Sequence, residues 1–253
     1  MANEIISDAL TRLQPKFRSL LAARIIKLTL NADSSRLNIA AALKILGANE
    51  TIAAQTFTPR SATKTDLLTG QISTTTEINY QNGIPQIPAN TAVQFQVQNN
   101  EVEDLYITVL VINPEGVIDI IFPNSWSAAE NATIVKANST LEIPKASDLW
   151  QITVKEPFGL SEVLVVASKS PLRKSLQSLQ VIARNQSRGD LPVSVGEKST
   201  EIIDLLLDDI NSSNTEELSR NNFSTSSTTS REKVRLSDTT QIAAMSITYE
   251  AVG

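Results

Sequence analysis

The strongest candidates for chemistry in this sequence are carboxylates at helical spacing. Asp204 and Asp208 stand four residues apart, with Glu201 and Asp209 beside them, and residues four apart on a helix lie on the same face. Such a pair could hold a divalent cation or perform acid/base catalysis. Because no other type of ligand lies nearby in the sequence, we interpret these carboxylates as the solvated face of an amphipathic helix and predict no metal site.

Nucleophilic chemistry has little support in this sequence. The chain contains no cysteine and no histidine, which removes the thiolate nucleophile, the commonest general base and the usual ligands of zinc. Serine and threonine are abundant, and Lys145, Lys169 or Lys174 could in principle activate one of them. No G-x-S-x-G turn surrounds a serine, however. We therefore predict that this chain is not an enzyme, has no catalytic residue and binds no cofactor.

The charge balance excludes two classes of partner. The chain has 22 Lys and Arg against 27 Asp and Glu, a net charge of −5 and a pI near 5.0, with no long basic run. We therefore expect neither nucleic acid nor a membrane as partner. No apolar run approaches the roughly 18 residues that span a bilayer. If Met1 is the natural start, the absence of a signal sequence predicts a cytoplasmic protein.

A β-hairpin over 105–123 is the element around which the other elements are expected to pack. Its first arm, 105–112, is apolar on both faces, as in a strand covered from both sides. Asn113, Pro114 and Gly116 then provide a turn: proline presets φ, and glycine supplies the left-handed residue of a three-residue loop. The sequence thus predicts a packed β domain with this hairpin at its centre.

The flanking segments divide the chain into three predicted parts. Residues 1–46 read as a helix followed by a β-hairpin, with strands at 24–31 and 36–46, although a helix stays possible for the second arm. Residues 47–90 read as a Thr/Ala/Gln-rich connection with short strands, the clearest at 75–80. Residues 91–253 read as the main β domain, with strands predicted at 92–98, 139–144, 150–154, 162–167 and 244–252.

Two helices and one mobile segment are predicted inside the main domain. The first helix, at about 171–184, has Ser170 as its N-cap and Pro171 at its first position. The second helix runs over about 199–210, and the Ser/Thr/Asn-rich residues 211–231 form a mobile surface segment. We predict a mainly antiparallel β-sandwich, immunoglobulin-like in style, with two or three peripheral α-helices.

Two tryptophans are the candidate binding residues. Trp150 shares a strand face with apolar residues and is predicted to lie in the core. Trp126 follows a strand end, beside Asn124, in a polar stretch. Aromatic residues on the loops of β-sandwiches often contact ligands or partner proteins. We therefore predict Asn124 and Trp126 as a possible partner surface.

The order of sequence blocks in the main domain resembles a known bacterial domain of unknown function. The resemblance is carried by three stretches in this order: Leu105–Asn124, Ile143-Pro144 and Pro157–Ala167. That domain often follows the caspase-like peptidase domain of cyanobacterial proteins related to metacaspases. The N-terminal stretches Leu20–Arg24, Leu28–Asn31 and Ser34–Leu37 also look like the segment that joins the two domains.

The resemblance implies a role beside a peptidase. The peptidase domain of such proteins uses a His–Cys dyad, which this chain lacks, so no catalytic residue carries over. The implied function is a non-catalytic accessory or interaction domain, the C-terminal region of a caspase-like cysteine peptidase. Its partner would be a caspase-like peptidase domain in cis or in trans, and other protein partners are possible. The alternative is a free-standing β-sandwich that binds peptide or glycan.

Overall fold

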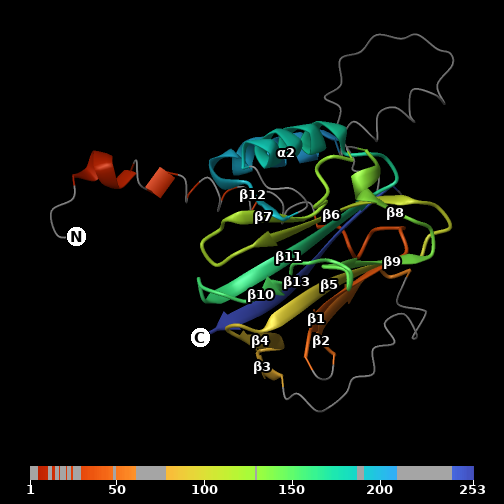
Figure 1. The fold of residues 1–253 in the computed structure, drawn as a ribbon, viewed down its shortest axis with the longest axis horizontal. Helices are drawn as coiled ribbons and strands as arrows, with labels where there is room; N and C mark the ends of the chain where they lie inside the picture. Colours follow the sequence, from red (N-terminus) through yellow and green to blue (C-terminus); the bar gives the residue numbers. More distant parts are fainter. Residues whose placement is uncertain are drawn as a thin grey trace, which may run out of the picture.

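A computed structural model gives the structure of residues 5–10, 13–14, 17, 21, 24, 30–47, 50–60, 78–128, 130–186, 191–209 and 241–253. Over these residues the chain folds as a β-sandwich of two sheets, with helices against the outer face of the larger one (Figure 1). The predicted fold class, a mainly β sandwich with peripheral helices, is confirmed.

The larger sheet has eight strands within the described residues, in the order β12-β7-β6-β11-β13-β4-β3, with β8 paired to β6. All its pairings are antiparallel except that of β13 with β4. Its strands are β3 (Asn79–Gln81), β4 (Ile84–Pro88), β6 (Leu105–Ile112), β7 (Ile118–Phe122), β8 (Ile134–Val135), β11 (Gly159–Ser168), β12 (Val193–Ser194) and β13 (Ile242–Val252).

The smaller sheet has five strands in the described part of the chain, in the order β10-β5-β1-β2, with β9 also paired to β5. Its strands are β1 (Ile39–Ile45), β2 (Thr51–Phe57), β5 (Ala92–Asn99), β9 (Ser139–Ile143) and β10 (Ile152–Thr153). Short 3₁₀ helices, η1 (Asn131–Thr133) and η2 (Gly196–Lys198), connect elements of the larger sheet and the helices. The helices beyond the sheet are α2 (Arg173–Asn185) and residues 199–209.

Two apolar cores result, one on each face of the larger sheet. Side chains such as Ile107, Val109 and Val165 fill the space between the two sheets. Leu110, Ile120 and their neighbours on the opposite face pack against the two helices. Because successive residues of a strand point to opposite faces, β6 contributes to both cores, as its two apolar faces predict.

The predicted hairpin is confirmed, including its turn. β6 and β7 pair antiparallel, and Gly116 has a φ of 81°. The Asn113 carbonyl accepts the Gly116 N–H at 2.9 Å, and the Asn113 side-chain oxygen accepts the N–H groups of Glu115 and Val117, each at 2.9 Å. An asparagine that closes its own turn in this way is a local signal, which is why the sequence located it.

The start of α2 differs from the predicted cap. The helix begins at Arg173, and Leu172 at its N-cap position makes no side-chain cap bond. The buried carboxylate of Asp209 takes that role from the other helix: it accepts the N–H of Lys174 at 3.1 Å and the N–H of Ser175 at 2.8 Å. The prediction of Ser170 as N-cap is wrong because a carboxylate distant in sequence supplies a stronger acceptor at the positive end of the helix.

The first predicted domain boundaries do not follow the sheets. β1 pairs with β2 and with β5, so residues from 39 onward belong to the sandwich, and the hairpin partner of β1 is β2. Of the predicted strand 24–31, residues 25–29 lie outside the described residues, and Arg24 is helical. Residues 75–77 and the predicted mobile segment 211–231 also lie outside the described residues.

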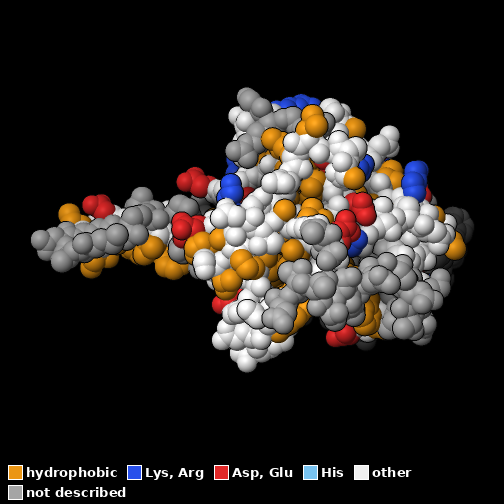
Figure 2. Space-filling model, turned by 60° about the horizontal axis from the view of Figure 1, so that its bottom comes forward, with side chains coloured by type: hydrophobic (Ala, Val, Ile, Leu, Met, Phe, Trp, Pro, Cys, Tyr) orange, Lys and Arg blue, Asp and Glu red, His pale blue; other side chains and the backbone are white. Residues whose placement is uncertain are grey.

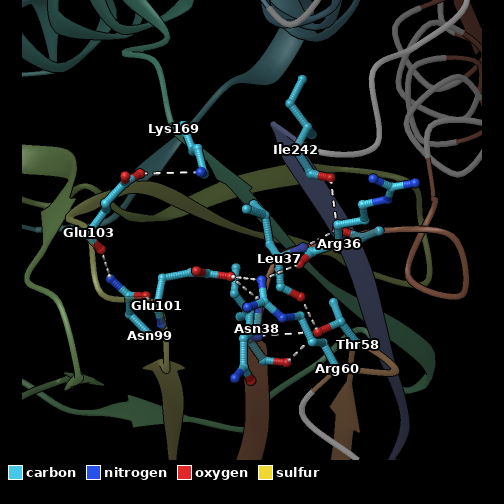
Figure 3. A network of polar contacts seen from close by, with 12 residues as sticks. Arg36, Leu37, Asn38, Thr58, Arg60, Asn99, Glu101, Glu103, Lys169 and Ile242 are labelled. Atoms are coloured by element: carbon cyan, nitrogen blue, oxygen red, sulfur yellow. Dashed lines mark hydrogen bonds and ion pairs between the residues drawn. The ribbon is translucent and has the colours of Figure 1, made fainter.

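A polar network joins both sheets at the end of the sandwich where β5 leads into β6 (Figure 3). Glu101 is 7% exposed, forms an ion pair with Arg60 at 3.3 Å and accepts the Asn38 N–H at 2.7 Å. The fully buried Asn99 accepts the N–H of Glu101 at 2.9 Å. The Asn99 amide nitrogen donates to three backbone carbonyls at 3.0, 3.0 and 3.1 Å: those of Glu103, Val135 and Lys136.

Candidate functional site

The opposite end of the sandwich holds a cleft of about 200 Å³ between the two sheets. Val93 and Phe95 of β5 line one wall, and Val111 and Ile121 of β6 and β7 line the other. A second space, under the helices, measures only about 10 Å³ because leucine and isoleucine side chains fill it. Of these two spaces in the described part of the chain, the end cleft is the one with room for a ligand.

Three polar side chains of the larger sheet lie on the face that forms this cleft. Ser161 on β11 stands directly opposite Tyr249 on β13, and both line the cleft. Asp119 on β7 stands opposite Val111 and shares its face with Ile121, whose side chain lies in the core between the sheets. Elsewhere among the described residues this face is apolar, so these three groups are the polar contribution of the larger sheet's strands to the cleft.

Burial perturbs the ionisation of one of these groups. Tyr249 is 9% exposed, and this desolvation raises its pKa above the ordinary tyrosine value. The hydrogen bond from Ser161 opposes the rise in the pKa, and the nearby negative charge of Asp119 adds to it. Tyr249 is therefore a neutral phenol at physiological pH, held in place by Ser161 and close to a carboxylate.

The raised pKa of Tyr249 predicts a stability loss at alkaline pH. The pKa of Tyr249 is higher in the folded state than in the unfolded state, so its neutral phenol contributes fully to stability below about pH 10, where tyrosine in the unfolded chain ionises. This contribution to stability is lost as the pH rises through the folded pKa. Tyr249→Phe should therefore show a shallower fall in the free energy of unfolding. Urea unfolding of both proteins between pH 8 and pH 11 measures this. If the free energy of unfolding falls equally with pH in both proteins, the raised pKa does not belong to Tyr249.

The connections at this end form the rim of the cleft. The turn that contains Asn113 and Pro114 borders one side, and residues 154–157, which connect β10 in the smaller sheet to β11 in the larger, border the other. The two connections touch at Gly159, whose φ is 126° and where an added Cβ would come within 3.3 Å of Pro114. Glycine is thus required at this position both by its backbone conformation and by the close approach.

The charged side chains that line the cleft differ in exposure. Asp119 is half-buried on the inner face of β7, whereas Lys155 and Glu156 are exposed on the rim. Two carboxylates and one ammonium give the cleft a net charge of −1. Next to the lining residue Pro157, the apolar side chain of Phe158 is 41% exposed. The cleft therefore combines apolar walls, an exposed apolar neighbour and a half-buried acidic group.

The carboxylates singled out in the sequence lie in different environments. Asp204 and Asp208 are exposed, as expected of a solvated helix face, and Asp208 lies 3.7 Å from the Lys174 ammonium. Asp209, by contrast, is buried as the cap of α2. Among the described residues, no group of three or more acidic side chains is placed to hold a metal ion.

The predicted partner surface at Asn124 and Trp126 is not supported. Trp126 is 5% exposed, packs in the core beneath the helices, and donates its indole N–H to the Leu191 carbonyl at 3.1 Å. Asn124 is half-buried. The prediction failed because residues 191–195, distant in sequence, cover Trp126. Trp150, predicted to lie in the core, is partly buried against the core between the sheets.

The sequence contained a signal for the cleft that its periodicity alone did not reveal. Asp119 interrupts an otherwise apolar strand, and Ser161 occupies an inward position of a strand whose other inward residues are apolar. A polar residue at an inward strand position breaks the expected alternation. Only the pairing of β11 with β13 brings Tyr249 beside them.

A second exposed feature is the N-terminal arm, the described helical residues between 6 and 24. Hydrophobic side chains gather along one side of this arm (Figure 2). They are Ile5, Ile6, Leu10, Phe17 and Leu21, each between 53% and 78% exposed. Exposed apolar rows of this kind are typical of surfaces that contact another molecule.

Comparison with known proteins places one domain in the chain. Residues 86–171 match the family described as "Domain of unknown function (DUF4384)". This span runs from β4 to the residues just before α2, and so includes the hairpin, β11 and most of the cleft lining. No curated protein and no solved structure matches the chain. None of the helices in the described residues is long and apolar enough to cross a membrane.

Proposed function

We propose that this chain is a non-catalytic interaction module whose end cleft receives a segment of a partner protein. The observation that carries the proposal is the cleft itself: an opening of about 200 Å³ at the end of the sandwich. Pockets for small molecules typically measure about 300–1,000 Å³. The smaller volume fits one or two side chains of a partner better than a complete ligand.

Two further observations support protein binding. The side chain of Phe158 follows the lining residue Pro157, is 41% exposed and adds apolar surface that a partner could bury. The N-terminal arm exposes a second apolar row. Interfaces are centred on apolar and aromatic residues surrounded by a polar rim, and the cleft with its charged rim has this composition.

A caspase-like peptidase domain, in cis or in trans, is the partner that we propose. The support is the resemblance of 105–167 to the domain that follows such peptidases. In that arrangement the peptidase domain performs the chemistry and this module contributes binding. The module would then alter the affinity or rate of the peptidase without hydrolysing peptides itself.

The test combines calorimetry with a peptide-cleavage assay. Adding the chain to a caspase-like catalytic domain should yield a measurable complex or a changed cleavage rate. Thr153→Trp, which fills the cleft with a large side chain, should weaken the complex at least about tenfold, since buried contacts at the centre of an interface contribute most of its binding energy. Thermal unfolding of the variant establishes that it folds.

Val102→Trp is the matched control, because Val102 is 83% exposed at the opposite end of the sandwich. It should leave binding unchanged. If Thr153→Trp and Val102→Trp weaken binding equally, or if no complex forms with the catalytic domain, the proposal is contradicted. If the chain binds isolated peptides but neither binds a peptidase domain nor changes its cleavage rate, the result would instead support a free-standing binding module. Hydrolysis by the purified chain would overturn both.

A further inference from the structure

The chemistry of the cleft lining indicates which side chain it fits. Its walls are mostly apolar residues of both sheets, so the body of a side chain that enters packs best if it is apolar. A long methylene chain meets this requirement without a branched or bulky body. The carboxylate of Asp119, which also lines the cleft, then determines which functional group that chain can carry.

The carboxylates in the cleft lining favour a positive charge. Asp119 is a half-buried carboxylate in a partly desolvated setting, where its interaction with a cation is stronger than in water. The rings of Phe95 and Tyr249 also line the cleft, and aromatic faces attract cations. Glu156 adds a second carboxylate at the rim. Among the described residues that line the cleft, the ammonium is that of Lys155, which is exposed, so solvent and salt screen its repulsion.

We propose that the cleft recognises the cationic side chain of an arginine or lysine residue in a partner's peptide segment. The aliphatic stem packs between the sheets, and the charged group reaches Asp119, with Glu156 at the entrance. This assignment rests on the proposed function, because it names the chemistry of the segment that the interaction module binds. It makes Asp119 the residue that determines specificity.

The experiment compares capped amino acids that differ in charge but not in shape. The full chain is titrated with Nα-acetyl-arginine methylamide and with the citrulline and norleucine counterparts, and amide chemical shifts around Thr153 and Ser161 are followed by NMR. The arginine probe should bind about tenfold or more tightly than the neutral citrulline probe, because a charge-assisted hydrogen bond is lost. The norleucine probe should bind no better than citrulline.

Variants separate a role in specificity from a role in folding. Asp119→Asn should bring the arginine-to-citrulline ratio close to one, whereas a merely structural role would weaken both probes equally. Glu156→Gln, on the exposed rim, should reduce the ratio less and is the second test if Asp119→Asn does not fold. Asp208→Asn, an exposed carboxylate on the helix over 199–209, should leave the ratio unchanged.

Several outcomes would overturn the inference. Equal binding of arginine and citrulline probes to the unaltered chain would remove the role of charge. A ratio that Asp119→Asn and Glu156→Gln leave unchanged would place the cation elsewhere. Tighter binding of 1,4-diaminobutane than of the capped arginine would identify a free amine rather than a peptide side chain as ligand. If Thr153→Trp prevents binding of the peptidase domain but no cationic probe binds the unaltered chain, only this inference fails. If the substitution does not weaken binding of the peptidase domain and no cationic probe binds, the proposed function fails as well.

Discussion

Ile120→Ala is expected to lower the free energy of unfolding by about 2–5 kcal/mol, the range for truncating a fully buried isoleucine. Ile120 is 1% exposed and lies in the core between the larger sheet and the helices. Alanine would remove apolar contacts and leave a cavity that the paired strands on both sides prevent from closing. Urea unfolding monitored by circular dichroism measures the loss.

Ile107→Ala extends this test to the other face of the sheet. Ile107 is fully buried between the two sheets, so a loss of the same size is expected. If the layers unfold as one cooperative unit, each variant shifts a single transition. Val102→Ala, at an exposed position, is the control and should change stability by less than about 0.5 kcal/mol. An equally small change for either isoleucine would mean that its core is peripheral.

Asn99→Ala is expected to cost about 2–4 kcal/mol because it removes one side chain from four backbone partners at once. The amide group of Asn99 is fully buried and connects the end of β5 with the residues around β8. Without it, the Glu101 N–H and the carbonyls of Glu103 and Val135 lose the hydrogen bond to Asn99, whereas the Lys136 carbonyl keeps its bonds from Ser139. Each buried group left unsatisfied costs about 1–3 kcal/mol where water does not reach it. Chemical unfolding is the measurement.

Two further variants show whether the geometry of Asn99 is the cause. Gln96→Ala, on the same strand, removes a half-buried side chain with one hydrogen bond to Glu142 at 3.3 Å and should cost clearly less. Asn99→Asp should cost at least as much as Asn99→Ala, since it sets a carboxylate oxygen against three carbonyl oxygens. An Asn99→Asp variant as stable as the unaltered protein would rule out the bonding pattern.

The parts of the fold that the sequence predicted correctly are those with local causes. The hairpin over 105–123 contains its own turn residues and two apolar faces. The strand predicted at 92–98 is β5, the strand predicted at 244–252 lies within β13, and the helix predicted at about 171–184 is α2 within two residues at each end. In each case the alternation or helical stripe extends over enough neighbouring residues to determine the local structure.

The candidate site was not predictable in the same way. The sequence indicated Trp126, but residues 191–195 bury that side chain. It indicated Ser170 as a cap, but the carboxylate of Asp209 binds the start of α2 instead. Both errors share a cause: the partner that decided the outcome lies tens of residues away in the chain, and no local pattern records which distant segment will pack there.

The cleft shows the division most clearly. The sequence by itself determined that Asp119 and Tyr249 are polar residues on strands, with Ser161 directly before a predicted strand, and the alternation along a strand places each side chain on a definite face. Only the tertiary structure decided that these faces point into one space, because that depends on β11 lying between β6 and β13 and on residues of both sheets lining the cleft. Strand order and sheet separation follow from the packing of the whole core, which is a property of all the strands together and not of any one segment.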